Sequence, residues 1–360
     1  MKNALSNPER FIRPEVRQLV PYEVKYLPEC IKLDANENPF PWPAGMLEAL
    51  FAENIAFNRY PDGMAQSLKE AISAYTEISP EGILVGNGSD ELIQLILLTF
   101  GGSGQSVIIH PPTFGMYQIS AHLTDTTVVE VPLLNGLDLD TDEMLKVALS
   151  PEAHVVIVCN PNNPTGSLFP REEILRLVQE SGKIVVVDEA YAEFSEETLI
   201  PEIKNYPNLV ILRTFSKSFG MAGLRLGYLL GQPEAIALIN RVRPPFNVNS
   251  FSQKAGILAL GYLGEYQAQI QQIKEETQQL QEALTQLPDV VVYPTKANFI
   301  LFKPDDSDGW ANELLKRGFL VRNMGVLPVL GKCLRISAGL PEDNEGFLRA
   351  IREISTQSCQ

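Results

Sequence analysis

Three polar side chains with complementary chemistry each follow a short apolar run of the chain. Asn163 comes shortly after VVIVC, Asp188 directly after IVVV, and Lys217 soon after LVIL. A lysine amine can condense with an aldehyde, and a buried carboxylate can keep the nitrogen of a heteroaromatic ring protonated. An amide beside them can hydrogen-bond an oxygen on the same ring. The set therefore predicts a site at which a lysine holds an aldehyde ligand covalently.

The elements that must position these side chains are predicted by alternating patterns between residues 80 and 230. Short β-branched or leucine-rich runs suit strands buried on both faces of a parallel sheet. Helical patterns such as REEILRLVQESG and DELIQLILLTFGG separate the runs, which predicts a doubly wound α/β domain. Ligands of such sheets bind beyond the carboxyl ends of the strands, so the three polar residues are expected in one crevice. The expected strands are 107–109, 155–159, 184–187 and 209–212.

The pattern changes after about residue 245. Residues 264–287 predict a long polar helix that links two domains, since sustained heptads are absent. The strand-like segments that follow lie among helices and predict a smaller α+β domain; they are 290–293, 299–302, 320–322 and 334–337. We expect residues 1–40 to form an N-terminal arm and part of the small domain, 41–245 the large domain, and 246–360 the small C-terminal domain with its linking helix.

Composition narrows the function classes. The chain has 360 residues and a formal net charge of −15, which disfavours broad binding to nucleic acid. The three histidines lack the spacing of a helical metal site, so we expect no metal. Four scattered cysteines fit a reducing compartment, and no apolar run approaches the ~20 residues that span a bilayer. We therefore expect a cytoplasmic enzyme without a membrane partner.

Three ordered motifs resemble the fold-type-I pyridoxal-phosphate (PLP) enzymes of the aspartate aminotransferase superfamily. They are NNPTG at 162–166, DEAY at 188–191 and SKSFGMAGLRLG at 216–227. The intervals of 29 positions from Asp188 to Lys217 and of eight from Lys217 to Arg225 also match that pattern. The resemblance implies a large doubly wound, mostly parallel sheet domain, a smaller α+β domain, PLP as cofactor and a transaminase activity.

The cofactor would be held by side chains from several of these motifs. Lys217, Asp188 and Tyr191 would be catalytic, with Lys217 as the covalent anchor and proton carrier. A glycine-rich turn that opens a helix at GNGSDELIQ suits the cofactor phosphate. By the resemblance, Phe114 would stack on the ring and Tyr60 would reach the cofactor of a partner subunit. The cofactor-binding set is Ser89, Asp90, Phe114, Asn163, Asp188, Tyr191, Thr214, Ser216, Lys217 and Arg225, with Tyr60 from the partner chain.

Within the superfamily, nearly the whole chain resembles the histidinol-phosphate aminotransferases. LDANENPF, NRYPDG, GNGSDE, PPTFGMY and CLRISAG carry this likeness. It implies a homodimer and a substrate pocket lined by Tyr22, Arg322 and Arg335. A phosphate ester carries close to two charges, which suits two guanidinium groups. The same pair can hold the two carboxylates of 2-oxoglutarate, so one site would serve both substrates of a ping-pong reaction.

Other functions remain open at the sequence level. An aromatic amino-acid aminotransferase would use a related pocket, and a decarboxylase of the threonine-phosphate type would also bind phosphate. Glutamate formation marks a transaminase, and release of carbon dioxide marks a decarboxylase. A transcription regulator with this fold would carry an N-terminal DNA-binding domain, whereas only about 40 irregular residues precede the body of this acidic chain.

Overall fold

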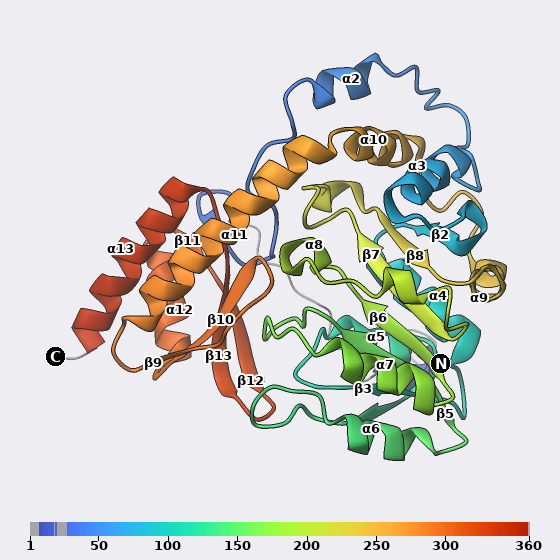
Figure 1. Cartoon of the computed structure of the whole chain (residues 1–360). Coiled ribbons are helices and arrows are strands. Elements are labelled where there is room, and N and C mark those ends of the chain that lie inside the picture. Colours follow the sequence, from blue (N-terminus) through green and yellow to red (C-terminus); the bar gives the residue numbers. More distant parts are fainter. Residues whose placement is uncertain (1–6, 18, 20–26, 359–360) are drawn as a thin grey trace.

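The computed structural model describes residues 7–17, 19 and 27–358 of the chain, and its central element is a seven-stranded sheet (Figure 1). Six strands are parallel, and only β8 runs antiparallel to both of its neighbours. In sheet order the strands are β2 (Ile83–Gly86), β8 (Gly227–Leu230), β7 (Leu209–Thr214), β6 (Ile184–Asp188), β5 (Ala153–Cys159), β3 (Ser106–Ile109) and β4 (Thr127–Glu130). The four strands expected from the apolar runs are all present, and the predicted mostly parallel sheet is confirmed.

Helices cover both faces of this sheet. Along β6, Val185 and Val187 belong to one apolar core and Val186 to another, so both faces of the strand are buried. This explains why the strands are apolar throughout rather than alternating. The helices of this part of the chain are α2 (Met46–Ala52), α3 (Gln66–Thr76), α4 (Ser89–Phe100), α5 (Met116–Leu123), α6 (Thr141–Ala148), α7 (Arg171–Glu180), α8 (Ala192–Ser195) and α9 (Pro233–Ile239).

A second, antiparallel sheet has its own apolar core. Its order is β12 (Arg322–Leu327), β13 (Gly331–Ser337), β10 (Phe299–Pro304) and β9 (Val290–Val292), and it packs with α12 (Ser307–Lys316) and α13 (Pro341–Ser358). One expected strand, 320–322, is divided here: β11 (Phe319–Leu320) pairs with β1 (Ile31–Lys32), while Arg322 begins β12. The two segments pair with different strands, Phe319 and Leu320 with β1 and the residues from Arg322 onward with β13.

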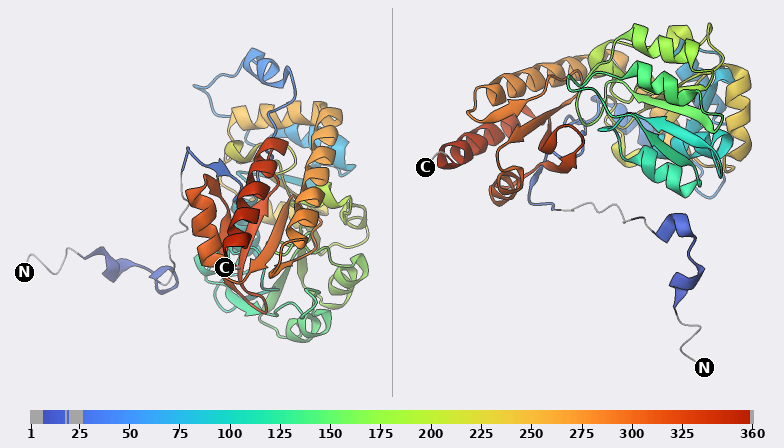
Figure 2. Two further views of the ribbon diagram at one scale, coloured as in Figure 1. Left: turned by 90° about the vertical axis from the view of Figure 1, so that its left-hand side faces the viewer. Right: turned by 90° about the horizontal axis from the view of Figure 1, so that it is seen from below.

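The long helix α11 (Leu263–Thr285) connects the two cores (Figures 1 and 2). Tyr266 belongs to the core of the large sheet, whereas Ile273, Leu280 and Leu284 belong to that of the small sheet. The predicted linking helix is thus present. Before it, α10 (Ser250–Gly261) packs against α2 and α3.

The remaining described elements are short. η1 (Pro8–Phe11) and α1 (Pro14–Arg17) extend from the body (Figure 2), and Arg13 donates a hydrogen bond to the carbonyl of Leu123 at 3.0 Å. The other single turns are η2 (Pro80–Gly82), η3 (Ile200–Glu202), η4 (Ala222–Leu224) and η5 (Asn240–Val242). Within the described residues, no helix has the length and apolar character needed to cross a membrane.

Candidate active site

Lys217 lies just beyond the carboxyl end of β7, where its side chain is half-buried. Its Nζ donates to the carbonyl of Ala35 at 2.9 Å and lies 5.9 Å from the ring centre of Tyr191. Burial lowers the pKa of Lys217 to about 8, and the positive charge of Arg335 acts in the same direction. About a tenth of this amine is therefore neutral at pH 7, far more than for an ordinary lysine, and the neutral form is the one that attacks carbonyl carbon.

Asp188 ends the neighbouring strand β6 and is only 3% exposed. Its Oδ2 accepts a hydrogen bond from the Tyr117 hydroxyl at 2.6 Å, and its Oδ1 accepts one from the backbone N–H of Ala190 at 3.1 Å. Burial raises the pKa of Asp188 to about 6 even though both hydrogen bonds favour the ionised form. Within the described residues, the groups that change this pKa most are hydrogen-bond donors and acidic side chains rather than cations. It is therefore prepared to accept a cationic partner.

Asn163, after β5, meets Arg335 from the small sheet. Arg335 is 7% exposed, and its Nη1 donates to Oδ1 of Asn163 at 2.6 Å while its Nη2 donates to the carbonyl of Asp34 at 2.7 Å. Arg322 is the cross-strand neighbour of Arg335 in the register of β12 and β13. Directly opposed residues of an antiparallel pair project from the same face, so the two predicted arginines share one side of this sheet.

A turn at residues 34–36 touches several of these side chains and was not predicted to do so. Its carbonyls accept hydrogen bonds from Arg335 and Lys217, and Nδ2 of Asn36 donates to the Tyr191 hydroxyl at 2.9 Å. Asn36 has a φ of 55° and is 1% exposed, and its backbone N–H donates to Oγ of Ser337 at 2.7 Å. The motif LDANENPF carries the family resemblance but does not by itself predict these contacts. They show that the turn joins the two sheets beside Lys217.

The start of α4 faces Arg225. Nη2 of Arg225 lies 3.1 Å from Oδ2 of Asp90, and this ion pair is substantially exposed. Gly88 has a φ of 83°, which favours glycine, and a Cβ there would lie 2.8 Å from the same guanidinium nitrogen, so Arg225 would have to shift. Ser89 begins the helix, and its N-terminal N–H groups provide a place for an anion.

Two predicted hydroxyl residues lie in the loop that leads to the lysine. Thr214 ends β7, and its Oγ1 accepts a hydrogen bond from the N–H of Ser216 at 3.1 Å. Both residues are buried. The loop is thereby held in place immediately before Lys217.

The remaining predicted residues differ in their placement. Phe114 is partly buried and lies edge-on to Tyr117, with ring centres 5.6 Å apart. Tyr60 is 81% exposed, so its own chain does not enclose it. Its ring stacks on that of Phe246, with ring centres 4.6 Å apart. Tyr22 lies outside the described residues.

A buried ion cluster stiffens the strand ends from the side opposite the site. Arg213 contacts Glu189 at 2.8 Å and Glu193 at 2.7 Å, with all three side chains at most 8% exposed. Because side chains alternate along a strand, Glu189 and Arg213 point away from Asp188 and Thr214, their immediate neighbours. The cluster ties together the two strand ends that carry the carboxylate and the lysine.

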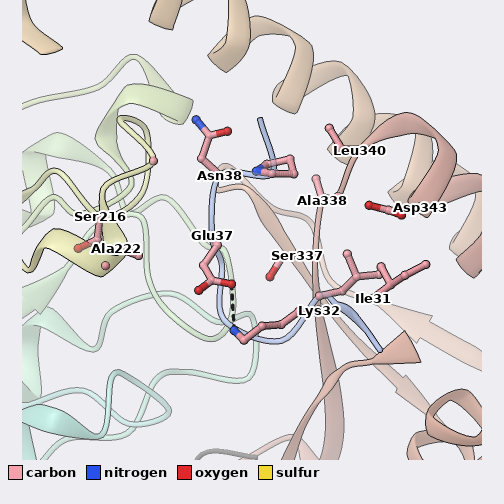
Figure 3. A pocket seen from close by; sticks show the side chains of 15 residues that line it. Ile31, Lys32, Glu37, Asn38, Ser216, Ala222, Ser337, Ala338, Leu340 and Asp343 are labelled. Atoms are coloured by element: carbon pink, nitrogen blue, oxygen red, sulfur yellow. Dashed lines mark hydrogen bonds and ion pairs between the residues drawn. The ribbon is translucent and has the colours of Figure 1, made fainter. Parts of the chain in front are cut away.

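A pocket of about 430 Å³ opens beside the lysine loop, between the two sheets (Figure 3). Ser216 and Ala222 lie on one wall, and Ala338 and Asp343 lie on the other. Neither Lys217 nor Asp188 lines it. The pocket therefore adjoins the loop that carries Lys217 but is separate from the side chains of Lys217 and Asp188.

Comparison with known proteins agrees with this geometry. The chain matches the family "Aminotransferase class I and II" over residues 28–351, which defines the class of enzyme. A histidinol-phosphate aminotransferase of Desulfitobacterium hafniense strain Y51 is 59% identical over 353 residues, covering 97% of this chain and 98% of that protein. One of Thermococcus gammatolerans is 40% identical and covers 94% and 96%. The chain therefore belongs, within the class I and II aminotransferases, to the histidinol-phosphate aminotransferase family.

Solved structures share the fold. The histidinol-phosphate aminotransferase of Clostridium acetobutylicum has a TM-score of 0.84 at 28% identity, covering 91% of this chain and 99% of that one. That of Sinorhizobium meliloti, solved in complex with pyridoxal-5'-phosphate, has a TM-score of 0.86 at 24% identity and covers 99% and 100%. The predicted fold class is confirmed.

Proposed function

We propose that the protein transfers the amino group of L-histidinol phosphate to 2-oxoglutarate, which yields imidazole acetol phosphate and glutamate in histidine biosynthesis. The observation that carries the mechanism is the placement of two groups at the carboxyl ends of neighbouring strands: Lys217, whose pKa is lowered, follows β7, and the buried Asp188 ends β6. Membership of the histidinol-phosphate aminotransferase family supports the choice of substrate.

The proposed cofactor is PLP, and the residues present fit it. Bound PLP supplies an electron sink for the carbanion that forms when the substrate loses a proton. Asp188 is a buried carboxylate, and the described groups that change its pKa most include no cation. A protonated ring nitrogen would therefore be a suitable partner for it. Lys217 offers a nucleophilic amine, and Phe114 offers an apolar face for the ring.

Each remaining side chain has a defined task in this proposal. Lys217, once its amine is free, would take the proton at Nζ from the substrate carbon that bears the amino group. It would then deliver that proton to the carbon at the other end of the same C–N–C unit, so that it acts first as base and then as acid. Tyr191 and Asn163 would hydrogen-bond the phenolic oxygen of the cofactor. Tyr191 is itself oriented by the amide of Asn36.

The phosphate of the cofactor is assigned to the start of α4 and the loop before Lys217. Backbone N–H groups at Ser89 and Asp90, together with the hydroxyls of Thr214 and Ser216, would donate hydrogen bonds to it. Arg225 contributes the positive charge, and its ion pair with Asp90 holds the guanidinium beside the helix start.

The substrate is assigned to the face of the small sheet that carries the two arginines. Arg335 is already oriented by Asn163 and Asp34, so little side-chain entropy is lost when an anion binds. Arg322 would add a second guanidinium for the phosphate ester or for the distal carboxylate of 2-oxoglutarate. Tyr22 is assigned to the same pocket from the sequence alone.

We further propose a cytoplasmic homodimer in which Tyr60 reaches the cofactor phosphate of the partner subunit. The support is the exposure of large aromatic side chains on the segment that carries Tyr60 and on Phe246, which stacks on it, because exposed apolar surface often marks an interface. Phe51, Phe57 and Tyr60 are between 70% and 81% exposed, and Phe246 is 44% exposed. Reduced thiols at Cys30, Cys159 and Cys333 fit the cytoplasm.

Two domains are proposed as the working units, with residues 41–245 forming the large one and 246–360 the small one. The arm is assigned to residues 1–40 from the sequence, and β1 within it joins the small domain through its pairing with β11. The link consists of α10, which packs on α3, followed by α11, which spans both cores.

Absorption spectroscopy tests the proposed function. The purified protein with PLP should show the visible band of the lysine-bound cofactor. L-histidinol phosphate should bleach it at far lower concentration than L-phenylalanine, and 2-oxoglutarate should restore it. Equal or better bleaching by phenylalanine would make the enzyme an aromatic amino-acid aminotransferase. Release of carbon dioxide without glutamate would identify a decarboxylase, and absence of the band would exclude a PLP enzyme.

A further inference from the structure

Tyr117 occupies a position that neither the motifs nor the proposed mechanism assigns. It lies on α5, its side chain is completely buried, and its ring packs edge-on against Phe114. From the sequence, either aromatic could be simple core. The hydroxyl, however, lies 2.6 Å from Oδ2 of Asp188. That separation is typical of a phenol that donates to an ionised carboxylate.

Within the described residues, the neighbouring side chains that affect the pKa of Asp188 most are negative or neutral. Cys159 is its neighbour in the register of β5 and β6, and burial raises the pKa of this thiol so that it stays neutral. Asp90 and Glu189 are negative and disfavour the ionised form of Asp188. His110, which accepts a hydrogen bond from the N–H of Cys159, is neutral because burial lowers its pKa to about 3.

Two hydrogen bonds therefore favour the carboxylate form in the described part of the chain, one from Tyr117 and one from the backbone of Ala190. Of these, only Tyr117 donates from a side chain. Burial and the charge of Asp188 raise the pKa of the phenol, so the proton stays on Tyr117 and the negative charge stays on the carboxylate.

We propose that Tyr117 is a positioning residue whose hydroxyl keeps Asp188 ionised and fixes the direction in which the carboxylate faces the ring nitrogen of the cofactor. This inference rests on the proposed function, since it assumes that PLP binds at Asp188. Core packing by itself requires only the ring of Tyr117, which phenylalanine would reproduce. The role of the hydroxyl can therefore be separated from the role of the ring.

The test compares Tyr117→Phe with Tyr228→Phe. Tyr228 is also buried, at 1% exposed, but its hydroxyl has no hydrogen-bond partner among the described residues. Infrared difference spectra of the cofactor-free proteins, with Asp188→Asn to assign the band, report the midpoint of Asp188 protonation. The affinity for PLP is then measured against pH. Loss of a hydrogen bond to a charged group should move the midpoint upward by about one to two pH units in Tyr117→Phe.

Support requires three results together. In Tyr117→Phe, the midpoint of Asp188 protonation and the acid limb of PLP binding shift upward by similar amounts. Neither shifts in Tyr228→Phe. In an Asp188→Asn background, Tyr117→Phe has no further effect on PLP affinity. An unmoved midpoint overturns the proposal, and so does an equal loss of PLP affinity in that background. The infrared measurement needs no cofactor, so a wild-type protein that fails to bind PLP would refute the proposed function while Tyr117 is still tested separately.

Discussion

Asp188→Asn removes a carboxyl group that folding places in an unfavourable environment. The pKa of Asp188 is about 6 in the folded protein, against an ordinary value of 3.8. The folded protein thus holds this proton more tightly than the unfolded chain does. Stability from this group is greatest at low pH and is lost as pH rises from about 4 to about 7. The full loss amounts to about 3 kcal/mol once the group is ionised in both states.

The variant should therefore stabilise the cofactor-free protein, provided that Asn keeps the contacts with Tyr117 and Ala190. We expect the free energy of unfolding to exceed that of the wild type by up to about 3 kcal/mol at pH 8 and by roughly half as much at pH 5. Reversible urea unfolding at both pH values gives these quantities. Asp142→Asn is a matched control, because its carboxylate is 82% exposed and should change stability by at most about 1 kcal/mol.

Added PLP should make the wild type more stable than Asp188→Asn, which reverses the order of their free energies of unfolding. A ligand that binds only the folded state stabilises it in proportion to its affinity, and the wild type retains the carboxylate that pairs with the ring nitrogen. Two results would refute a raised pKa for Asp188. One is an Asp188→Asn protein that is less stable than the wild type at pH 8 without PLP. The other is a gain in its free energy of unfolding that does not shrink toward pH 5.

Three further predictions concern other side chains of the site. Asn36→Ala removes the donor to Tyr191 and should lower kcat by about tenfold with PLP still bound, as measured at saturating substrate; an unchanged kcat would contradict this. Arg322→Ala should raise the KM for L-histidinol phosphate by at least about tenfold and affect L-phenylalanine little, whereas equal losses in steady-state assays would count against a phosphate contact. Because the pKa of Lys217 is lowered to about 8, the rate at which cofactor-free protein condenses with PLP should level off above pH 8; stopped-flow absorbance that still climbs steeply to pH 10 would refute a perturbed lysine.

The parts of this structure that were predictable have strong local signals. Continuous apolar runs mark strands covered on both faces, and the predicted β3, β5, β6 and β7 are present. Lys217 and Asp188 could be assigned because each follows such a strand and sits in a motif with defined spacing. Their meeting at one edge of the sheet then follows from the parallel order of β6 and β7.

The contacts that orient those residues depend on long-range geometry. Asn36 reaches Ser337 and Tyr191, which are 301 and 155 positions away, through a left-handed turn that no local pattern predicts. In the sequence Tyr117 resembles an ordinary core residue, because the partner of its hydroxyl, Asp188, is distant along the chain and no local pattern predicts their contact. The alignment of Arg322 with Arg335 depends on the register of an irregular antiparallel pair, which the chain sets by packing rather than by spacing.

The most direct test of the account is to follow the nitrogen itself. L-histidinol phosphate labelled with ¹⁵N at its amino group is incubated with the enzyme, PLP and 2-oxoglutarate, and the glutamate is examined by mass spectrometry. We predict labelled glutamate with the wild-type protein and none with Lys217→Ala. Unlabelled product with the wild type, or full transfer of label by Lys217→Ala, would contradict the claim that this lysine carries out amino transfer from histidinol phosphate.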